Sequence, residues 1–320
     1  MIPEILIGLF IIALLVLFFY LYPYVFLEVI GLIPYFIYKQ IYKLGLVRNA
    51  NFFITSKGYI EFIIRGDNGP VLLYVHGSPG GCDQNIDPSK DYKVLTPSRP
   101  GYRRTDISVG RTPEEQADSF KALLDSLNIN KVFIMGVSGG GPSSMHFAAK
   151  YPEMTLGLVL FEAVSLSQDF MKEDEQLIKT WDFKLFIQLL FLSSFGNERL
   201  AKIMLPNERN RAKLLSSEKN ISLLKRIIWS IWPMSIRRLG VKNDYEQFAK
   251  LNIPYDEILS PTLIIHGDED KNVDIAHAQH AHKSIKGSSL YIVKEGDHMM
   301  HATHPEEIEG QLASFIKENS

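Results

Sequence analysis

The stretch that decides the fold is Lys131-Val132-Phe133-Ile134-Met135-Gly136-Val137-Ser138-Gly139-Gly140, with a helix-forming segment at 143–150. Its first half is a continuous apolar run, typical of a strand buried on both faces of a parallel sheet. Residues 136–140 fit Gly-x-Ser-x-Gly, a pattern in which a serine stands on a tight turn between strand and helix. Gly136 and Gly140 leave room where strand and helix approach closely. The stretch therefore predicts strand, sharp turn and helix, with Ser138 exposed as a candidate nucleophile.

Working outward, short apolar runs and helical segments alternate on both sides of this turn. Further buried strands are expected at 71–75, 156–161, 262–265 and 290–293, and a β-hairpin at 52–65. Helix starts with a proline at the first position and acids in the first turn occur at 112–115 and 304–307. Strands that alternate with helices indicate an α/β fold with a mainly parallel sheet flanked by helices.

Residues 166–250 interrupt this alternation. They contain amphipathic and aromatic helical stretches around Trp181, Phe186, Trp229 and Trp232, and no convincing buried strand. We predict that this segment is a helical lid inserted over the carboxyl edge of the sheet. The core is then expected to consist of residues 49–165 and 251–320.

The N-terminal segment, residues 1–48, has a different character. No charge occurs from Ile5 to Leu27, a run long enough to cross the ~30 Å hydrocarbon core of a membrane as a helix. A cleaved signal peptide is the alternative, but no Lys or Arg precedes the run, and the run exceeds a usual signal sequence. We predict an uncleaved, single-pass transmembrane anchor.

The charges that flank this run predict its orientation. Lys39, Lys43 and Arg48 lie on its C-terminal side, which places the catalytic domain in the cytoplasm by the positive-inside rule. Residues 28–38 could form an interfacial segment or a second span, and a second span would leave the side of the membrane open.

The composition excludes some classes of protein. The chain has 320 residues, 46 % hydrophobic and 22 % charged, as in ordinary globular proteins. A formal net charge of −2 lacks the strongly basic balance of a nucleic-acid-binding protein. Cys82 is the one cysteine, so no disulfide can form within the chain.

Two further sites at predicted strand ends complete a chemical pattern. A serine hydroxyl needs a base to take its proton, and the base needs an acid to orient it. The run at 262–265 leads into an acidic loop containing Asp268 and Asp270, and the run at 290–293 is followed by Asp297 and His298. Side chains at the carboxyl ends of parallel strands converge at one edge of the sheet.

Taken together, these motifs make residues 52–320 resemble the α/β-hydrolase family, in the branch of esterases, lipases and iminopeptidases. The matching motifs are His76-Gly77-Ser78-Pro79-Gly80-Gly81, Arg99-Pro100-Gly101-Tyr102, Gly136-Val137-Ser138-Gly139-Gly140, His266-Gly267-Asp268-Glu269-Asp270 and Gly296-Asp297-His298. The resemblance implies an eight-stranded sheet and a triad of Ser138, Asp270 and His298. It also implies an oxyanion hole formed by the backbone N–H groups of Ser78 and Gly139, with no cofactor and no metal.

Alternatives remain for individual residues. Asp268 and Glu162 compete with Asp270 as the acid, because some members of the family carry the acid after the strand that follows the nucleophile. His301 lies close to His298, whereas His304 is expected to start a helix. A metal site at His277, His280 and His282 is conceivable, but a solvated helix face is the simpler expectation.

One position departs from the family pattern. After Arg-Pro-Gly-Tyr, members commonly continue with Gly-x-Ser, whereas this chain has Arg103-Arg104-Thr105. The two arginines could bind an anionic group of the substrate, or they could belong to a solvated loop.

The lid gives an indication of the substrate. Residues 199–242 contain 11 Lys or Arg and only two acids, Glu208 and Glu218, interleaved with large apolar residues. Such a pattern suits either a lid on an anionic bilayer or a helix with a charged outer face. With the anchor, it favours a serine hydrolase that cleaves a lipophilic acyl ester at a membrane lipid surface. The alternatives are an acyltransferase, an aminopeptidase, a perhydrolase or lyase with the same triad, and a non-catalytic receptor.

Overall fold

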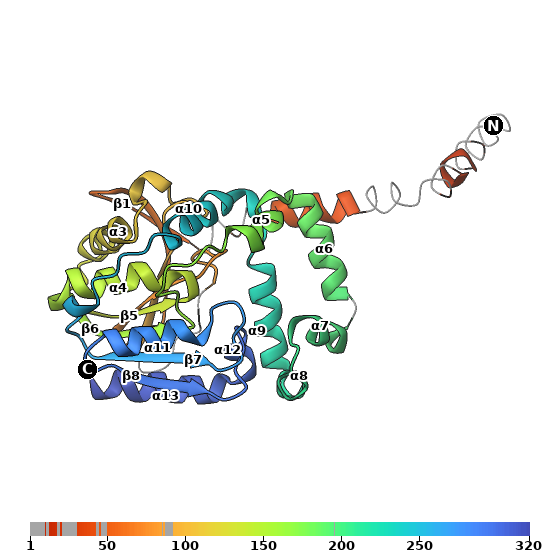
Figure 1. Cartoon of the computed structure of the whole chain (residues 1–320). Coiled ribbons are helices and arrows are strands. Elements are labelled where there is room, and N and C mark those ends of the chain that lie inside the picture. The colour runs from red at the N-terminus through yellow and green to blue at the C-terminus, as the bar shows by residue number, and fades with distance from the viewer. Residues whose placement is uncertain are drawn as a thin grey trace. The chain divides into compact units, whose positions relative to one another are not determined.

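The computed structural model describes residues 10, 13–17, 20, 31–42, 45, 50–84, 86, 92–194 and 196–320 (Figure 1). The chain divides into two compact units, Met1–Asn49 and Ala50–Ser320. In the first unit, residues 31–42 are helical. No helix within the described residues has the length and apolar character needed to cross a membrane. Most of the uncharged run at 5–27, where the anchor is predicted, lies outside the described residues.

An eight-stranded sheet forms the centre of the second unit, in the order β1-β2-β4-β3-β5-β6-β7-β8. β1 and β2 form the predicted hairpin, and β2 also pairs antiparallel with β4. The remaining neighbours are parallel, so the expected mainly parallel eight-stranded sheet is confirmed. The strands are β1 Asn51–Thr55, β2 Gly58–Arg65, β3 Val71–Val75, β4 Lys93–Pro97, β5 Val132–Val137, β6 Thr155–Phe161, β7 Thr262–Gly267 and β8 Ser289–Val293.

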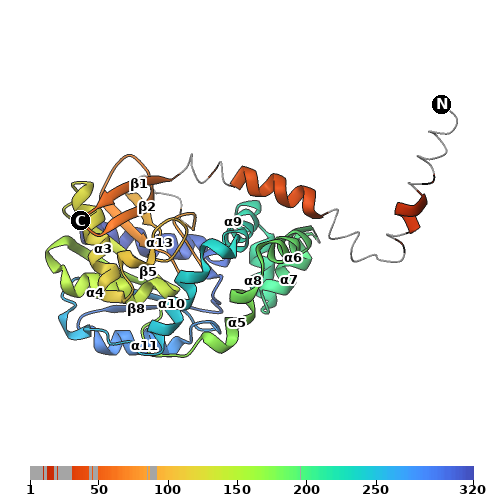
Figure 2. The ribbon, with the colours of Figure 1, turned by 90° about the horizontal axis from the view of Figure 1, so that it is seen from above.

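Helices cover both faces of the sheet (Figure 2). One core cluster joins α3 (Pro113–Ser126), α4 (Gly141–Lys150) and α11 (Ile275–Ser284) to the sheet, and a second joins α13 (Pro305–Glu318) to it. The helix start predicted at residue 112 is confirmed, because Thr112 and Glu115 form a reciprocal capping box ahead of α3. His304 is the residue that precedes α13, as expected.

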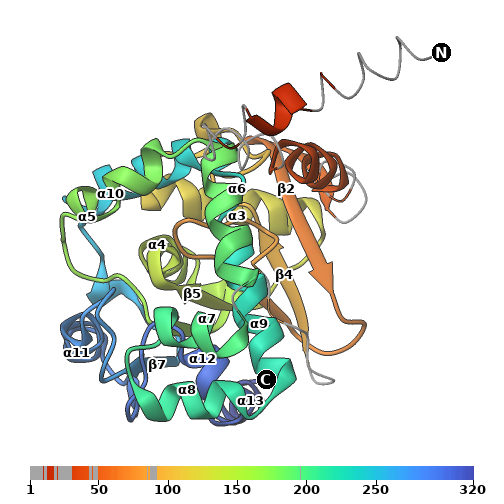
Figure 3. The same ribbon diagram turned by 90° about the vertical axis from the view of Figure 1, so that its right-hand side faces the viewer.

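The helical insertion between β6 and β7 is also confirmed. Figure 3 looks onto several of its helices. Its interior holds an aromatic cluster in which the ring of Phe186 lies 5.8 Å from both Trp229 and Trp232, whereas Trp181 is 79 % exposed. The helices are α5 Met171–Lys179, α6 Asp182–Ser194, α7 Asn197–Met204, α8 Glu208–Leu215, α9 Glu218–Trp229 and α10 Arg238–Phe248.

Candidate active site

Ser138 stands on a strained turn between β5 and α4. Its φ is 48°, in the left-handed region that side chains seldom occupy. The turn is tight because its neighbours are glycines. A Cβ on Gly140 would lie 2.2 Å from the carbonyl oxygen of Val75, and one on Gly136 would lie 2.7 Å from the hydroxyl of Ser144. The strand, turn and helix predicted around Ser138 are thus confirmed.

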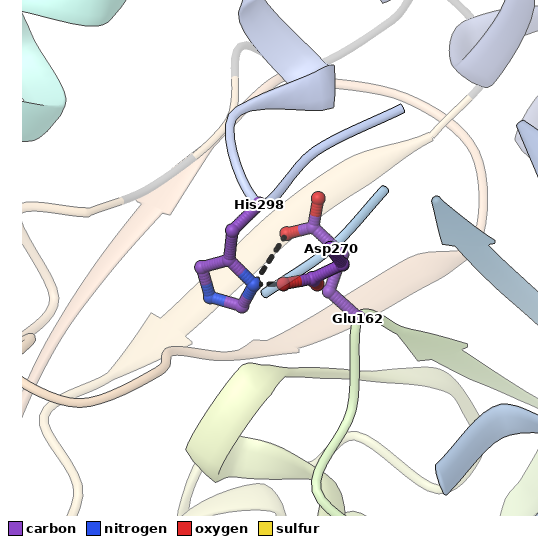
Figure 4. Close-up of side chains that lie close together, drawn as sticks. All are labelled: Glu162, Asp270 and His298. Atoms are coloured by element: carbon purple, nitrogen blue, oxygen red, sulfur yellow. Dashed lines mark hydrogen bonds and ion pairs between the residues drawn. The ribbon is translucent and has the colours of Figure 1, made fainter. Parts of the chain in front are cut away.

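Asp270 and His298 come together at the carboxyl ends of β7 and β8 (Figure 4). His298 Nδ1 lies 2.7 Å from Asp270 Oδ2, and the backbone N–H groups of Asn272 and Val273 donate to Asp270 Oδ1. Burial alone raises the pKa of Asp270, but the hydrogen bond and charge of His298 hold it below its ordinary value. Asp270 is therefore ionised at neutral pH and fixes the imidazole with Nδ1 toward the carboxylate.

Several of the candidate residues line the same cavity, which has a volume of about 480 Å³. Ser138, His298, Ser78 and Gly139 all line it. Both Ser138 and His298 are described, and no hydrogen bond joins their side chains in this structure. Catalytic hydrogen bonds often tighten only when a substrate is bound, so this separation is compatible with proton transfer between them.

The loop that carries Ser78 packs directly on the turn that carries Ser138. A Cβ on Gly139 would lie 2.4 Å from Ser78 Oγ, so the two residues expected to form the oxyanion hole are adjacent. His76, at the start of this loop, is fully buried, and burial followed by the charge of Arg99 lowers its pKa well below the ordinary value. Its neutral ring accepts the N–H of Arg99 at 2.9 Å, which makes His76 a structural residue of the loop.

Glu162 is a second carboxyl beside the imidazole, as Figure 4 shows. It follows β6 with φ 49°, and its Oε2 lies 3.9 Å from His298 Nδ1. Burial, reinforced by the charge of Asp270, raises its pKa well above the ordinary value, which favours the protonated form of Glu162. These three side chains also have the composition of a metal site, with donor atoms within 4.8 Å of one another, but His298 Nδ1 is already bonded to Asp270.

The remaining candidates for acid and base have other neighbours. Asp268 is exposed and accepts the backbone N–H of Glu295 at 2.6 Å. His301 lines the cavity with its ring against Phe161, and burial lowers its pKa to about 4. His304 bonds to Thr303 and Lys213 on the side of α13. Asp270 and His298 are thus the acid and histidine that share a bond at the cavity.

The expectation of a solvated face at His277, His280 and His282 is wrong for His277. This side chain is buried, and its Nδ1 accepts the backbone N–H groups of Ser165 and Leu166 at 2.9 and 3.0 Å. Burial is the largest cause that lowers its pKa to about 4. The sequence contains no signal for this role, because the partners of His277 lie more than 100 positions away. His277 anchors the loop at which the lid leaves the core.

Both expectations for Arg103 and Arg104 are also wrong. Each guanidinium bonds to Glu61, which is fully buried on β2, at distances of 2.9 to 3.1 Å. Arg104 also stacks on the ring of Phe52 at 3.8 Å. The two arginines therefore neutralise a buried carboxylate and attach the loop to the β1–β2 hairpin.

Sequence reasoning did not find two buried residues of the lid that hold the loops of the site. Arg99 and Tyr102 belong to a motif that was recognised, but their common partner, Asp244, lies on α10 in the lid and belongs to no motif. On the other side of the cavity, Asn210 on α8 is fully buried and donates to the carbonyl of Glu295 and to Asp297, in the loop of His298. The lid therefore supports both loops of the site.

Comparison with known proteins agrees with this fold. A model of the alpha/beta hydrolase fold family matches residues 70–305. The chain is 28 % identical to the uncharacterized hydrolase YcgS of Bacillus subtilis over 267 residues, 76 % of this chain and 89 % of that protein. It is 25 % identical to a 2-hydroxy-6-oxo-6-phenylhexa-2,4-dienoate hydrolase of Burkholderia cepacia, over 82 % of this chain and 94 % of that protein.

A solved alpha/beta hydrolase fold protein from Nakamurella multipartita is similar in structure. Its TM-score is 0.75 at 27 % identity, covering 85 % of this chain and all of that one. The family model matches well over half of the residues, and the matched range includes Ser138 and His298. The chain therefore belongs to the alpha/beta hydrolase fold family.

Proposed function

We propose that the protein is a serine hydrolase that cleaves a carboxylic ester with a lipophilic acyl group. The observation that carries this proposal is the single cavity that Ser138, His298, Ser78 and Gly139 line together, with Asp270 bonded to the far side of the imidazole. Those are the groups that two-step acyl transfer requires.

The reaction assigns one task to each group. His298 Nε2 takes the proton of Ser138 as its oxygen attacks the ester carbonyl, and the backbone N–H groups of Ser78 and Gly139 stabilise the oxyanion. His298 then gives the proton to the leaving alcohol, and an acyl-enzyme remains. Water, deprotonated by His298, releases the acid and restores Ser138. Asp270 keeps the imidazole in the tautomer with its proton on Nδ1.

The lining of the cavity supports a lipophilic acyl group. Apolar side chains come from both the core and the lid, and they include Val164, Phe170, Leu177, Met204, Leu223, Ile227, Ile231, Phe248 and Val273. A smaller polar part of the wall includes Asp83, Gln84 and Ser230. Apolar walls that surround a few fixed polar groups are typical of sites for small amphipathic molecules.

A membrane location belongs to the same proposal. The uncharged run at 5–27 supports an anchor, and the helical residues 31–42 leave Ile33, Phe36, Ile37 and Ile41 exposed at the spacing of one helix face. The basic lid supports it less strongly, because Arg237 is buried against Asp83 and Arg238 bonds to backbone carbonyls. The positive charges of Lys39, Lys43 and Arg48 after the run favour an orientation in which the catalytic unit faces the cytoplasm.

A panel of esters tests the substrate class. The full-length protein is assayed on p-nitrophenyl esters of two to sixteen carbons, monoacylglycerols, an aminoacyl amide and a 2-hydroxy-6-oxohexa-2,4-dienoate. We expect hydrolysis of the esters, with kcat/KM rising as the acyl chain lengthens beyond four carbons. Cleavage of the amide or the dienoate without ester hydrolysis would contradict the proposal, and added alcohol acceptors separate hydrolysis from acyl transfer.

A further inference from the structure

A buried ion pair lies behind the Ser78 loop, on the side away from the cavity. Arg99 and Asp244 are joined by two parallel bonds, Nη1 to Oδ1 at 2.8 Å and Nη2 to Oδ2 at 2.5 Å, and each side chain is at most 2 % exposed. Tyr102, fully buried, places its hydroxyl 2.5 Å from the same Oδ2. None of the three residues is among those that line the cavity, so they act on the site through other groups.

The hydroxyl of Ser78 is the point at which these three side chains meet. It donates to Asp244, and it lies 3.0 Å from Arg99 Nη2 and 3.1 Å from the Tyr102 hydroxyl. Tyr102 has a single proton and its shorter contact is with Asp244, so the Ser78 hydroxyl donates to Asp244 and accepts from Arg99 Nη2. These bonds fix the direction of the Ser78 side chain.

Arg99 also fixes the backbone of the same loop. Its Nε donates to the carbonyl of His76 at 2.8 Å, and its Nη2 lies 3.3 Å from the carbonyl of Gly77. A Cβ on Gly77 would approach Ser138 Cβ to 3.0 Å, so this loop lies directly against the nucleophile turn. Because oxyanion donors act only within about 3 Å of the developing charge, a small shift of the loop would lower the rate.

Asp244 is the one acid in this cluster, and it comes from the lid. Replacing a buried ion pair by apolar residues is often neutral or stabilising, so stability gives little reason for a bidentate pair at this place. We propose that Asp244 is a positioning residue: with Arg99 and Tyr102 it clamps Ser78 so that its N–H faces the oxyanion. This makes α10 a fixed part of the catalytic site. The inference rests on the proposed function, because it assigns a task within acyl transfer.

The test compares Asp244→Asn with Glu246→Gln, a matched change at an exposed position of the same helix. Each variant is assayed on p-nitrophenyl butyrate, and the rate at which a fluorophosphonate labels Ser138 is measured beside it. For Asp244→Asn we expect kcat to fall about 10- to 100-fold with KM within about threefold, because oxyanion stabilisation acts only in the transition state. The labelling rate should fall in proportion, and Glu246→Gln should resemble the wild type.

A double variant separates positioning from stability. Arg99→Met with Asp244→Leu removes both buried charges, so the fold is retained, as circular dichroism and the melting temperature will show. We expect kcat and labelling to stay low, because Ser78 has lost its bonds to Arg99 and Asp244. Wild-type kcat and labelling in either folded variant would overturn the inference. Labelling depends on the triad and the oxyanion loop but not on the identity of the substrate, so it tests the clamp even if the ester is not the substrate.

Discussion

Single residues at this site are held in unusual states by their neighbours, and these states can be measured. Ser138 and Glu162 both have positive φ, at the ends of adjacent strands β5 and β6. Strain of this kind persists where surrounding packing over-determines the backbone, and it is concentrated at functional sites. Glu162 in addition keeps Oε1 without a hydrogen-bond partner while it is fully buried. The strained backbone and the unpaired carboxyl oxygen both destabilise the fold locally, and an ordinary core would avoid them.

Replacing Glu162 by Gln should stabilise the protein increasingly as pH rises. The folded pKa of Glu162 is raised, so above pH 4.5 the unfolded chain loses a proton that the folded protein retains. This difference lowers the free energy of unfolding as pH rises, and glutamine removes it. Urea unfolding at pH 5 and pH 8 measures the effect, with the exposed Glu153→Gln as control. An equal gain at both pH values would refute the raised pKa of Glu162.

Gly140→Ala should destabilise the turn below Ser138. The new Cβ would lie 2.2 Å from the carbonyl oxygen of Val75, and backbone must move to admit it. Overpacking of this kind costs about 1–3 kcal/mol or more. Gly310→Ala in helix α13 is the control, because a Cβ at this position meets nothing within 4 Å. This substitution should stabilise the protein by about 0.5–1 kcal/mol. Denaturant unfolding compares the two, and equal midpoints would contradict the close approach.

Residues that carry a local pattern could be found from the sequence, and residues whose partners are remote could not. Ser138, Asp270 and His298 each follow a recognisable strand, and their order along the chain predicts which side chains meet. Asp244 has no such signal, because its partner Arg99 is 145 positions away. Arg103 and Arg104 looked available for a ligand for the same reason: the buried Glu61 that they neutralise is about 40 positions earlier.

At the scale of elements, runs of apolar residues located seven of the eight strands. β4, Lys93–Pro97, was not predicted, because only Val94 and Leu95 in it are apolar and Pro97 ends it. Its place between β2 and β3 is fixed by pairing with both neighbours, which sequence patterns do not report. The helical insertion was predicted as a lid. Only the structure shows that α8 contacts the loop of His298 and that α10 contacts Arg99, behind the loop of Ser78.

The junction between α11 and the start of the lid should weaken in acid. His277 has a folded pKa of about 4, so between pH 6.5 and 4 the unfolded chain binds a proton that the folded protein does not. The free energy of unfolding should therefore decrease as the pH is lowered over this interval. The protonation of His277 should account for roughly 3 kcal/mol of that decrease. Urea unfolding from pH 7 to 4.5 compares the wild type with His277→Gln. The variant should be less stable at pH 7 and show a shallower decline, and parallel curves would contradict this role.

At the scale of the whole molecule, two units are described separately, and the proposed catalytic groups all lie in Ala50–Ser320. The family model also begins at residue 70, beyond the proposed anchor. The proposed chemistry and the proposed membrane attachment therefore depend on different parts of the chain, and they can be tested independently of each other.

A variant lacking residues 1–48 tests the membrane proposal. Full-length protein should sediment with membranes, and the shortened protein should remain in the supernatant. Turnover of p-nitrophenyl butyrate should change by less than about twofold, whereas turnover of monoacylglycerol in anionic vesicles should fall about tenfold or more. Equal sedimentation of both proteins would contradict an anchor, and equal turnover of the vesicle substrate would contradict a role for it in substrate access.

The central claim is that Ser138 is the nucleophile of an ester hydrolase. The most direct measurement is the rate of p-nitrophenyl butyrate hydrolysis by the wild type and by Ser138→Ala, with the melting temperature recorded for both. Loss of the nucleophile should lower kcat on the order of 10⁴-fold or more and leave the melting temperature close to that of the wild type. A folded Ser138→Ala variant that keeps more than about a tenth of the wild-type kcat would contradict the claim.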